Sequence, residues 1–140
     1  MNLKFRIKIY LKYITINFLS LLGAVFTFFL FHLCSVKKII SFVTSISSFF
    51  LRNFRKRVDF QSIFFLSRKM NRFLGIDSCF RICVSQKIVL SIFGYDVQVV
   101  CGVKSSIEDP IDGHAWIVYK NKPILEENEN IDNYIESFVI

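Results

Sequence analysis

A cysteine, a histidine and a carboxylate stand along the second half of the chain in an order that permits thiol chemistry. Cys79 begins an apolar, helix-like stretch, where unpaired backbone N–H groups and the positive end of the helix dipole favour a thiolate. His114 begins a β-like stretch, and Glu126 follows it by twelve residues, across a short turn. A nucleophilic thiolate needs a base and a group that orients the base. The three residues therefore predict the catalytic set of a cysteine hydrolase.

The neighbours of these residues admit both packing and chemical roles. Trp116 stands two residues after His114, so both side chains share one face of a strand, and we expect the indole to pack beside the imidazole and contact substrate. Cys83 and Cys101 lie in apolar stretches and are predicted to be core residues. An alternative is a zinc site of three cysteines and a histidine, formed by Cys79, Cys83, Cys101 and His114, although the spacing lacks the CxxC pattern of structural zinc sites. We expect no metal and no directly bound cofactor.

The elements that must position these residues read as one helix followed by strands. Residues 79–93 predict a helix, with Asp77 or Ser78 as its N-cap and Gly94 as its end. Strands are predicted at 96–103, 114–119 and 123–126, with a loop at 104–113, a tight turn at 120–122 and an acidic tail with a helical or extended end.

The first part of the chain reads as apolar helices. Residues 13–36 contain no Lys, Arg, Asp or Glu, and this length is sufficient for a transmembrane helix. The core helix of a soluble bundle fits the same stretch, so both interpretations stay open. Residues 39–51 and 60–74 predict two further helices, the last closed by Gly75. Helices followed by a small antiparallel sheet make an α+β fold.

Charge divides the chain into two parts. Of 140 residues, 53% are hydrophobic and 17 are Phe, and the formal net charge is +7. Residues 1–72 carry thirteen Lys and Arg against Asp59 alone, which gives +12, whereas residues 73–140 carry five against ten acidic residues, which gives −5. We divide the chain into a basic helical region, 1–74, and a catalytic core, 75–140. The basic region could face anionic lipid or an acidic partner, and no nucleic-acid-binding motif accompanies it.

From about Gly75 to Glu127 the chain resembles the lasso-peptide B protein in its split form, a leader peptidase of the papain-like and transglutaminase-like cysteine protease superfamily. The resemblance rests on Cys79-Phe80 opening a helix, Gly94 ending it, a strand closed by Gly102-Val103, the His114-Ala115-Trp116 motif, and Glu126 on the next strand.

The resemblance implies a fold, a reaction and partners. The fold is a transglutaminase-like core in which a helix carries the cysteine and an antiparallel sheet carries the histidine and the acid. Cys79 is then the nucleophile, His114 the general base and Glu126 the orienting acid, with Glu127 as a possible substitute. The reaction is removal of the leader from a ribosomally made lasso-peptide precursor before macrocyclisation.

The implied partners are the leader peptide, a separate leader-recognition protein and an ATP-dependent macrolactam-forming cyclase, which would account for the pathway's use of ATP. We expect a cytoplasmic protein, attached to the inner membrane surface through residues 13–36 if that stretch is not a core helix. The alternative function is a non-catalytic, membrane-associated protein that binds a partner.

Overall fold

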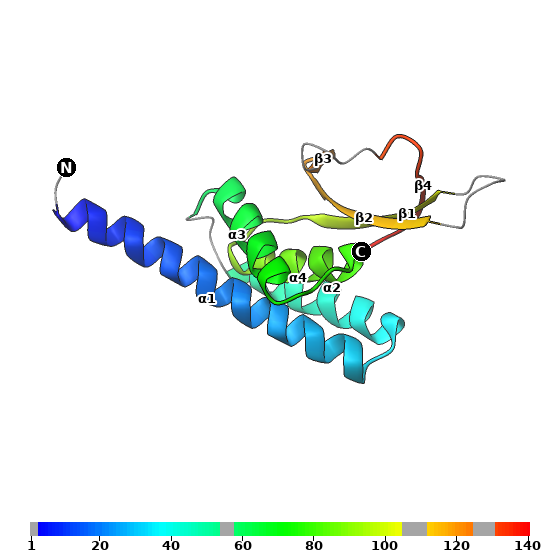
Figure 1. The fold of residues 1–140 in the computed structure, drawn as a ribbon, viewed down its shortest axis with the longest axis horizontal. Coiled ribbons are helices and arrows are strands. Elements are labelled where there is room, and N and C mark those ends of the chain that lie inside the picture. The colour runs from blue at the N-terminus through cyan, green and yellow to red at the C-terminus, as the bar shows by residue number, and fades with distance from the viewer. Residues whose placement is uncertain (1–2, 54–57, 105–111, 125–130) are drawn as a thin grey trace.

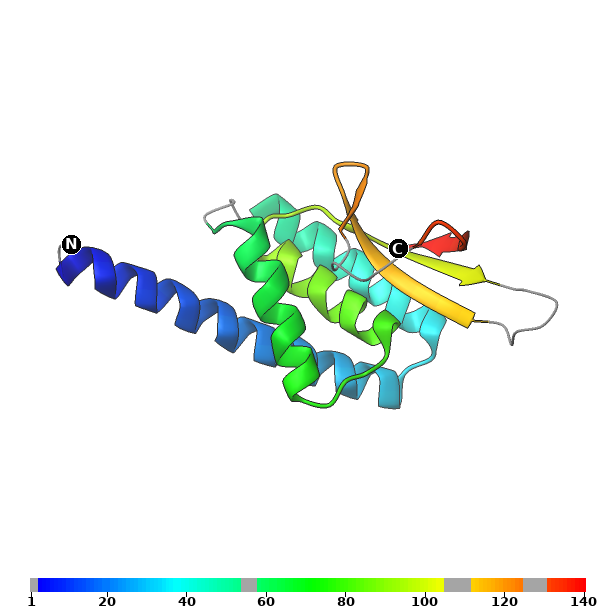
Figure 2. The ribbon, with the colours of Figure 1, turned by 45° about the horizontal axis from the view of Figure 1, so that its top comes forward.

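The computed structural model describes residues 3–53, 58–104, 112–124 and 131–140. Four helices precede a four-stranded sheet, which confirms the α+β fold (Figure 1). The sheet lies over one side of the helices, and α4 lies between the sheet and the other helices, as Figure 2 also shows. The elements are α1 (Leu3–Leu33), α2 (Val36–Asn53), α3 (Phe60–Phe73), α4 (Cys79–Ile92), β1 (Gln98–Lys104), β2 (Asp112–Tyr119), β3 (Lys122–Ile124) and β4 (Ile135–Val139).

Helix α4 is the centre of the molecule. It contacts α1, α2 and α3 as well as strands β1 and β2, and every residue from Ile82 to Ser91 is buried. A helix covered on all sides needs internal partners for its polar groups. The Gln86 amide donates to the Phe64 carbonyl at 3.2 Å, and the Asn71 amide donates to the Ser85 hydroxyl at 3.2 Å. These bonds tie α4 to α3 and fix the helix that begins at Cys79.

Helix α1 packs against α3 and α4 through small side chains. Its buried residues follow one face of the helix and are Ile16, Ser20, Gly23, Ala24 and Thr27. A β-carbon on Gly23 would lie 2.7 Å from a methyl group of Val89, so glycine lets the two helices approach closely. Many large apolar side chains elsewhere on α1 are exposed, among them Leu11, Phe18 and Phe29, and the N-terminal part of the helix projects away from the other elements (Figures 1 and 2).

The stretch Ile9–Leu33 is long and apolar enough to cross a membrane, judged by length and composition. Only 28% of its apolar window is buried in the molecule. The helix therefore serves in part as a core helix, while most of this apolar window is not buried in the molecule.

Local capping defines the ends of α3 and α4. The Asp59 carboxylate accepts a hydrogen bond from the Ser62 backbone N–H at 2.9 Å and so caps the start of α3. Gly75 (φ +69°) and Gly94 (φ +79°) follow the two helices in the left-handed conformation, which confirms both as helix-ending residues. Ser78 is the N-cap residue of α4, as expected.

The sheet has the strand order β3-β2-β1-β4, and all three pairings are antiparallel. Lys120 and Asn121 have φ values of 53° and 61°, the left-handed conformation that two-residue hairpins with right-handed twist require. The expected three-residue turn is therefore too long by one residue, since Lys122 already belongs to β3. Strand β2 begins at Asp112 rather than at His114, because Asp112 pairs with Lys104.

The acidic tail contributes a strand, β4, that pairs with β1. The register shifts between Cys101 and Gly102, so the two strands pair on either side of an irregularity. Backbone hydrogen bonds in both directions between Val99 and Ile140 extend this edge.

One core joins helices and sheet. It contains Ile16 of α1 and Phe64 of α3 together with Val89 of α4, Val99 of β1 and Ile117 of β2. Residues of both parts of the chain, 1–74 and 75–140, share this core. The division at residue 74 therefore stays a prediction about function, in which the first part supports the second and the second carries the candidate site.

Candidate active site

Cys79 is the first residue of α4, at the end of the helix that meets strand β2. Its side chain is half-buried. The side chain of Ser78 makes no capping hydrogen bond, so it leaves the N–H groups of the first turn available to another acceptor. The Cys79 thiol lies 3.9 Å from the carbonyl oxygen of Gly113, the residue directly before His114. The thiol is thus beside the start of the His114 motif, thirty-four residues away in the sequence.

His114 lies on β2, opposite Gly102 of β1, and is half-buried. Its ring stacks near the indole of Trp116, with centroids 6.2 Å apart and planes 22° apart. The Tyr134 ring lies 5.5 Å from the imidazole and 6.4 Å from the indole. The expected shared face of His114 and Trp116 is confirmed, and Tyr134 completes an aromatic cluster around the histidine.

Cys79 and His114 approach the same short segment of β2 from different sides. Ala115 and Ile117 belong to the core that Cys79 packs against, so strand alternation turns His114 and Trp116 to the other face. Within the described residues, no hydrogen bond joins the Cys79 sulfur to the His114 ring, and the thiol donates only to the Gly113 carbonyl. Because the His114 side chain leaves β2 on the opposite face, a direct thiol–imidazole contact requires the ring to turn around the edge of the strand or the strand itself to shift.

Gly102 makes room for the aromatic cluster. A β-carbon at this position would lie 2.8 Å and 3.0 Å from two carbons of the Trp116 ring, and 3.0 Å from Cβ of Tyr134. The side chains of Trp116 and Tyr134 would have to shift to admit any side chain at this position. Glycine is therefore required opposite His114 because the indole and Tyr134 occupy the volume above it.

Tyr134 and Asp112 were not predicted as site residues. The Tyr134 hydroxyl donates a hydrogen bond to the Asp112 carboxylate, and this bond raises the pKa of Tyr134. Burial and the charge of Asp112 raise the pKa of Tyr134 further, and nearby Cys79 makes the smallest contribution, so the thiol lies close to the aromatic cluster. Tyr134 stands in an acidic tail without a motif. The one available signal was the position of Asp112 two residues before His114, on the same face of the strand.

For three of the predicted residues, the functional role stays a prediction. Glu126 and Glu127 lie outside the described residues, so their roles stay predictions. Trp116 is 4% exposed, which establishes its packing role beside His114, whereas contact with a substrate stays a prediction.

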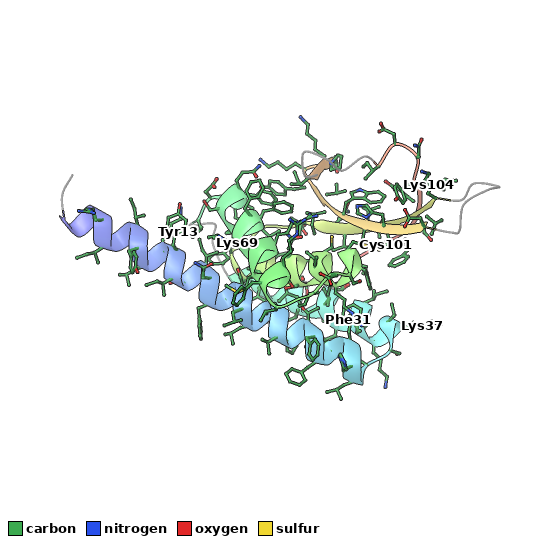
Figure 3. All side chains as sticks on the ribbon, viewed as in Figure 1. Tyr13, Phe31, Lys37, Lys69, Cys101 and Lys104 are labelled. Carbon is green, nitrogen blue, oxygen red and sulfur yellow. The ribbon has the colours of Figure 1, made fainter. Side chains whose placement is uncertain are left out.

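The remaining cysteines behave as core residues. Cys83 is buried and donates to the Ala115 carbonyl at 3.4 Å, and Cys101 faces the helices from β1 (Figure 3). Burial, with a smaller contribution from the charge of Cys79, raises the pKa of Cys101 to about 11. Among the described residues, no three His, Cys, Asp or Glu side chains are grouped to hold a metal ion. All four residues of the alternative zinc site are described, and they do not form such a group.

Comparison with known proteins gives one match. The model of the Transglutaminase-like superfamily matches residues 55–139, which is more than half of the chain and includes Cys79, His114 and Trp116. No curated protein and no solved structure matches the chain. The matched region begins in the segment before α3 and ends with β4, so it covers the central helix and the whole sheet. The chain belongs to the transglutaminase-like superfamily.

Proposed function

We propose that the protein is a thiol-dependent peptidase that removes the leader from a lasso-peptide precursor, with Cys79 as nucleophile and His114 as general base. The observation that carries this proposal is the position of Cys79, half-exposed at the first turn of the central helix and in contact with the backbone next to His114. The superfamily includes cysteine peptidases, which supports the reaction class.

The proposed reaction has two halves. The Cys79 thiolate attacks the carbonyl carbon of the scissile peptide bond, and the N–H groups at the start of α4 stabilise the oxyanion. The amine leaves with a proton from the His114 imidazolium, and the leader remains as a thioester on the Cys79 sulfur. His114 then takes a proton from water, the hydroxide attacks the thioester, and the thiol is regenerated as the carboxylate product leaves.

The proposal requires the imidazole to turn toward the thiol. Catalytic hydrogen bonds are often long in free enzymes and shorten when substrate binds. Within the described residues, β3 pairs with β2 only from Ile117 to Tyr119, so it leaves the β2 backbone around His114 unpaired on that side. We propose that Glu126, or Glu127, holds the rotated ring. In the structure the ring rests between Trp116 and Tyr134.

The proposed partners follow from the resemblance of the sequence. A separate recognition protein delivers the leader peptide, and an ATP-dependent cyclase receives the freed core peptide. We place the enzyme in the cytoplasm, at the inner face of the membrane, because the precursor and ATP are found there and α1 exposes apolar surface.

The test is a cleavage assay with the precursor and the recognition protein, followed by mass spectrometry. Cys79→Ala should abolish release of the leader, and a thioester-linked leader should be trapped on the wild-type enzyme after a brief reaction. Cys34→Ala is the matched control, because Cys34 is also half-buried but lies between α1 and α2. This control should cleave at the wild-type rate.

The same assay separates the peptidase from the non-catalytic alternative. If Cys79→Ala folds and still matures the precursor at the normal rate, the protein is a partner-binding component and not the protease. His114→Ala should lose activity as well. Retention of activity in that variant would assign the base to another group.

A further inference from the structure

The outer side of α1 carries a continuous row of large apolar side chains. The row consists of Leu11, Ile14, Phe18, Leu22, Val25 and Phe29, which recur every three or four residues and so share one face of the helix. It lies opposite the small residues that pack against α3 and α4. We call these six residues the outer row.

The outer row is too large an apolar surface to be left in water. Its members are between 39% and 59% exposed. With roughly 200 Å² for a fully exposed large apolar side chain, they expose roughly 600 Å² together. The Phe26 ring beside the row contacts the Phe42 ring of α2, with centroids 5.7 Å apart, so the surface continues onto α2. Soluble monomers rarely expose a contiguous apolar patch of this size, so something covers it.

We propose that the outer row docks the protein onto the surface of an anionic lipid bilayer, with α1 lying in the plane of the membrane. In this arrangement the apolar side chains enter the boundary between headgroups and acyl chains. The side of α1 that an ordinary interfacial helix turns to water is covered here by α3 and α4. The proposal stands whether or not Cys79 is catalytic.

The packing of α1 favours a helix in the membrane plane over one that spans the bilayer. The small residues that pack on α3 and α4, from Ile16 to Thr27, lie in the middle of the apolar stretch. A spanning α1 would have to leave this contact or carry α3 into the hydrocarbon. Helix α3 exposes Lys69 (labelled in Figure 3) and Arg72, and charged side chains inside the hydrocarbon are costly.

The charge distribution favours anionic lipid over a second copy of the chain. Arg6 is exposed near the start of α1, and Lys37 (labelled in Figure 3) and Lys38 are exposed just after its end, so cations stand beyond both ends of the outer row. Residues 1–72 carry thirteen Lys and Arg against one Asp, which gives +12. Two such surfaces would repel each other, whereas the headgroups of phosphatidylglycerol attract them.

The test measures binding of the purified protein to vesicles by sedimentation. We expect the protein to bind vesicles of equal parts phosphatidylcholine and phosphatidylglycerol, and to bind pure phosphatidylcholine more weakly. Phe18→Glu combined with Leu22→Glu should reduce binding about tenfold or more, because two apolar anchors are lost and two negative charges are added. Ile135→Glu is the control, since Ile135 is 75% exposed but lies on β4 in the sheet. It should bind as the wild type does.

Three outcomes would overturn the proposal. The first is a folded double variant that binds anionic vesicles as tightly as the wild type. The second is a wild-type dimer that ignores vesicles and that the double variant converts to a monomer, because a second copy would then cover the row. The third concerns topology. A tag placed before Met1 should be digested by protease on the same side of the membrane as the sheet, and protection of the tag would show a spanning helix.

Discussion

Replacement of Gly102 by alanine should destabilise the protein and displace the indole beside His114. The added β-carbon would lie 2.8 Å from one carbon of the Trp116 ring and 3.0 Å from a second carbon and from Cβ of Tyr134. Ordinary van der Waals contacts begin at about 3.4 Å, so the indole or the strand has to move by roughly half an ångström. Trp116 is buried, and hydrogen-bonded pairing fixes the backbone on both strands.

The magnitude follows from two opposing effects. Overpacking of a buried site costs about 1–3 kcal/mol. Alanine in place of glycine regains about 0.5–1 kcal/mol, because the unfolded chain loses conformational freedom. Gly113→Ala is the matched control, since Gly113 is likewise a strand glycine next to His114, on β2, and a β-carbon there would have nothing within 4 Å. The difference in unfolding free energy between the two variants isolates the overpacking cost, about 1–3 kcal/mol.

The assay is urea unfolding followed by fluorescence, for which Trp116 is the only tryptophan in the chain. Gly102→Ala should lower the urea midpoint and shift the native emission of Trp116 to longer wavelength. Gly113→Ala should raise the midpoint slightly and leave the emission unchanged. Equal midpoints and equal native emission for the two variants would refute the close packing of Trp116 and Tyr134 over Gly102.

Three further predictions concern single titratable side chains. Burial lowers the pKa of Lys87, so the unfolded chain binds the Lys87 proton more tightly than the folded chain does. The stability of the wild type relative to Lys87→Met should therefore rise as the pH increases toward 10.5. Denaturant midpoints of the wild type that fall relative to those of the variant across this range would contradict the prediction. The hydrogen bond from the Ser62 N–H lowers the pKa of Asp59, so Asp59→Ala should lower the unfolding free energy by about 1 kcal/mol at neutral pH. This loss of stability should disappear in acid below pH 3.8, where the carboxylate becomes protonated, and thermal unfolding across this pH range measures it. Burial raises the pKa of Cys101 to about 11, so iodoacetamide should label Cys79 well before Cys101 at pH 8. Peptide mass spectrometry measures the labelling of each cysteine. Equal labelling of the two would exclude the packing described for Cys101.

Features set by neighbouring residues could be predicted from the sequence. Gly75 and Gly94 end helices because glycine adopts the left-handed conformation without steric cost, and this requirement is local. The shared face of His114 and Trp116 follows from strand alternation alone. The start of a helix at Cys79 was indicated by the polar residues before it and the apolar residues after it.

Features set by distant residues could not be predicted. Strand β4 has a short, mixed pattern, and it is a strand because β1 offers it an edge. The contact of Tyr134 with His114 depends on that pairing, so no local pattern announces it. Helix α1 begins at Leu3, ten residues before the uncharged stretch 13–36. The charged residues before that stretch do not mark the start of the helix, because Lys and Arg are good helix formers.

The position of β1 inside the sheet has a consequence for the order of events during synthesis. Both partners of β1, strands β2 and β4, follow it in the chain, so β1 cannot join a sheet until those later residues have been made. The helical layer depends mainly on earlier segments, and local contacts form faster than distant ones. Tyr134 reaches His114 only after the last strand is available. A nascent chain would therefore form the helix that begins at Cys79 well before the strand side of the candidate site, with His114 and Tyr134, is assembled.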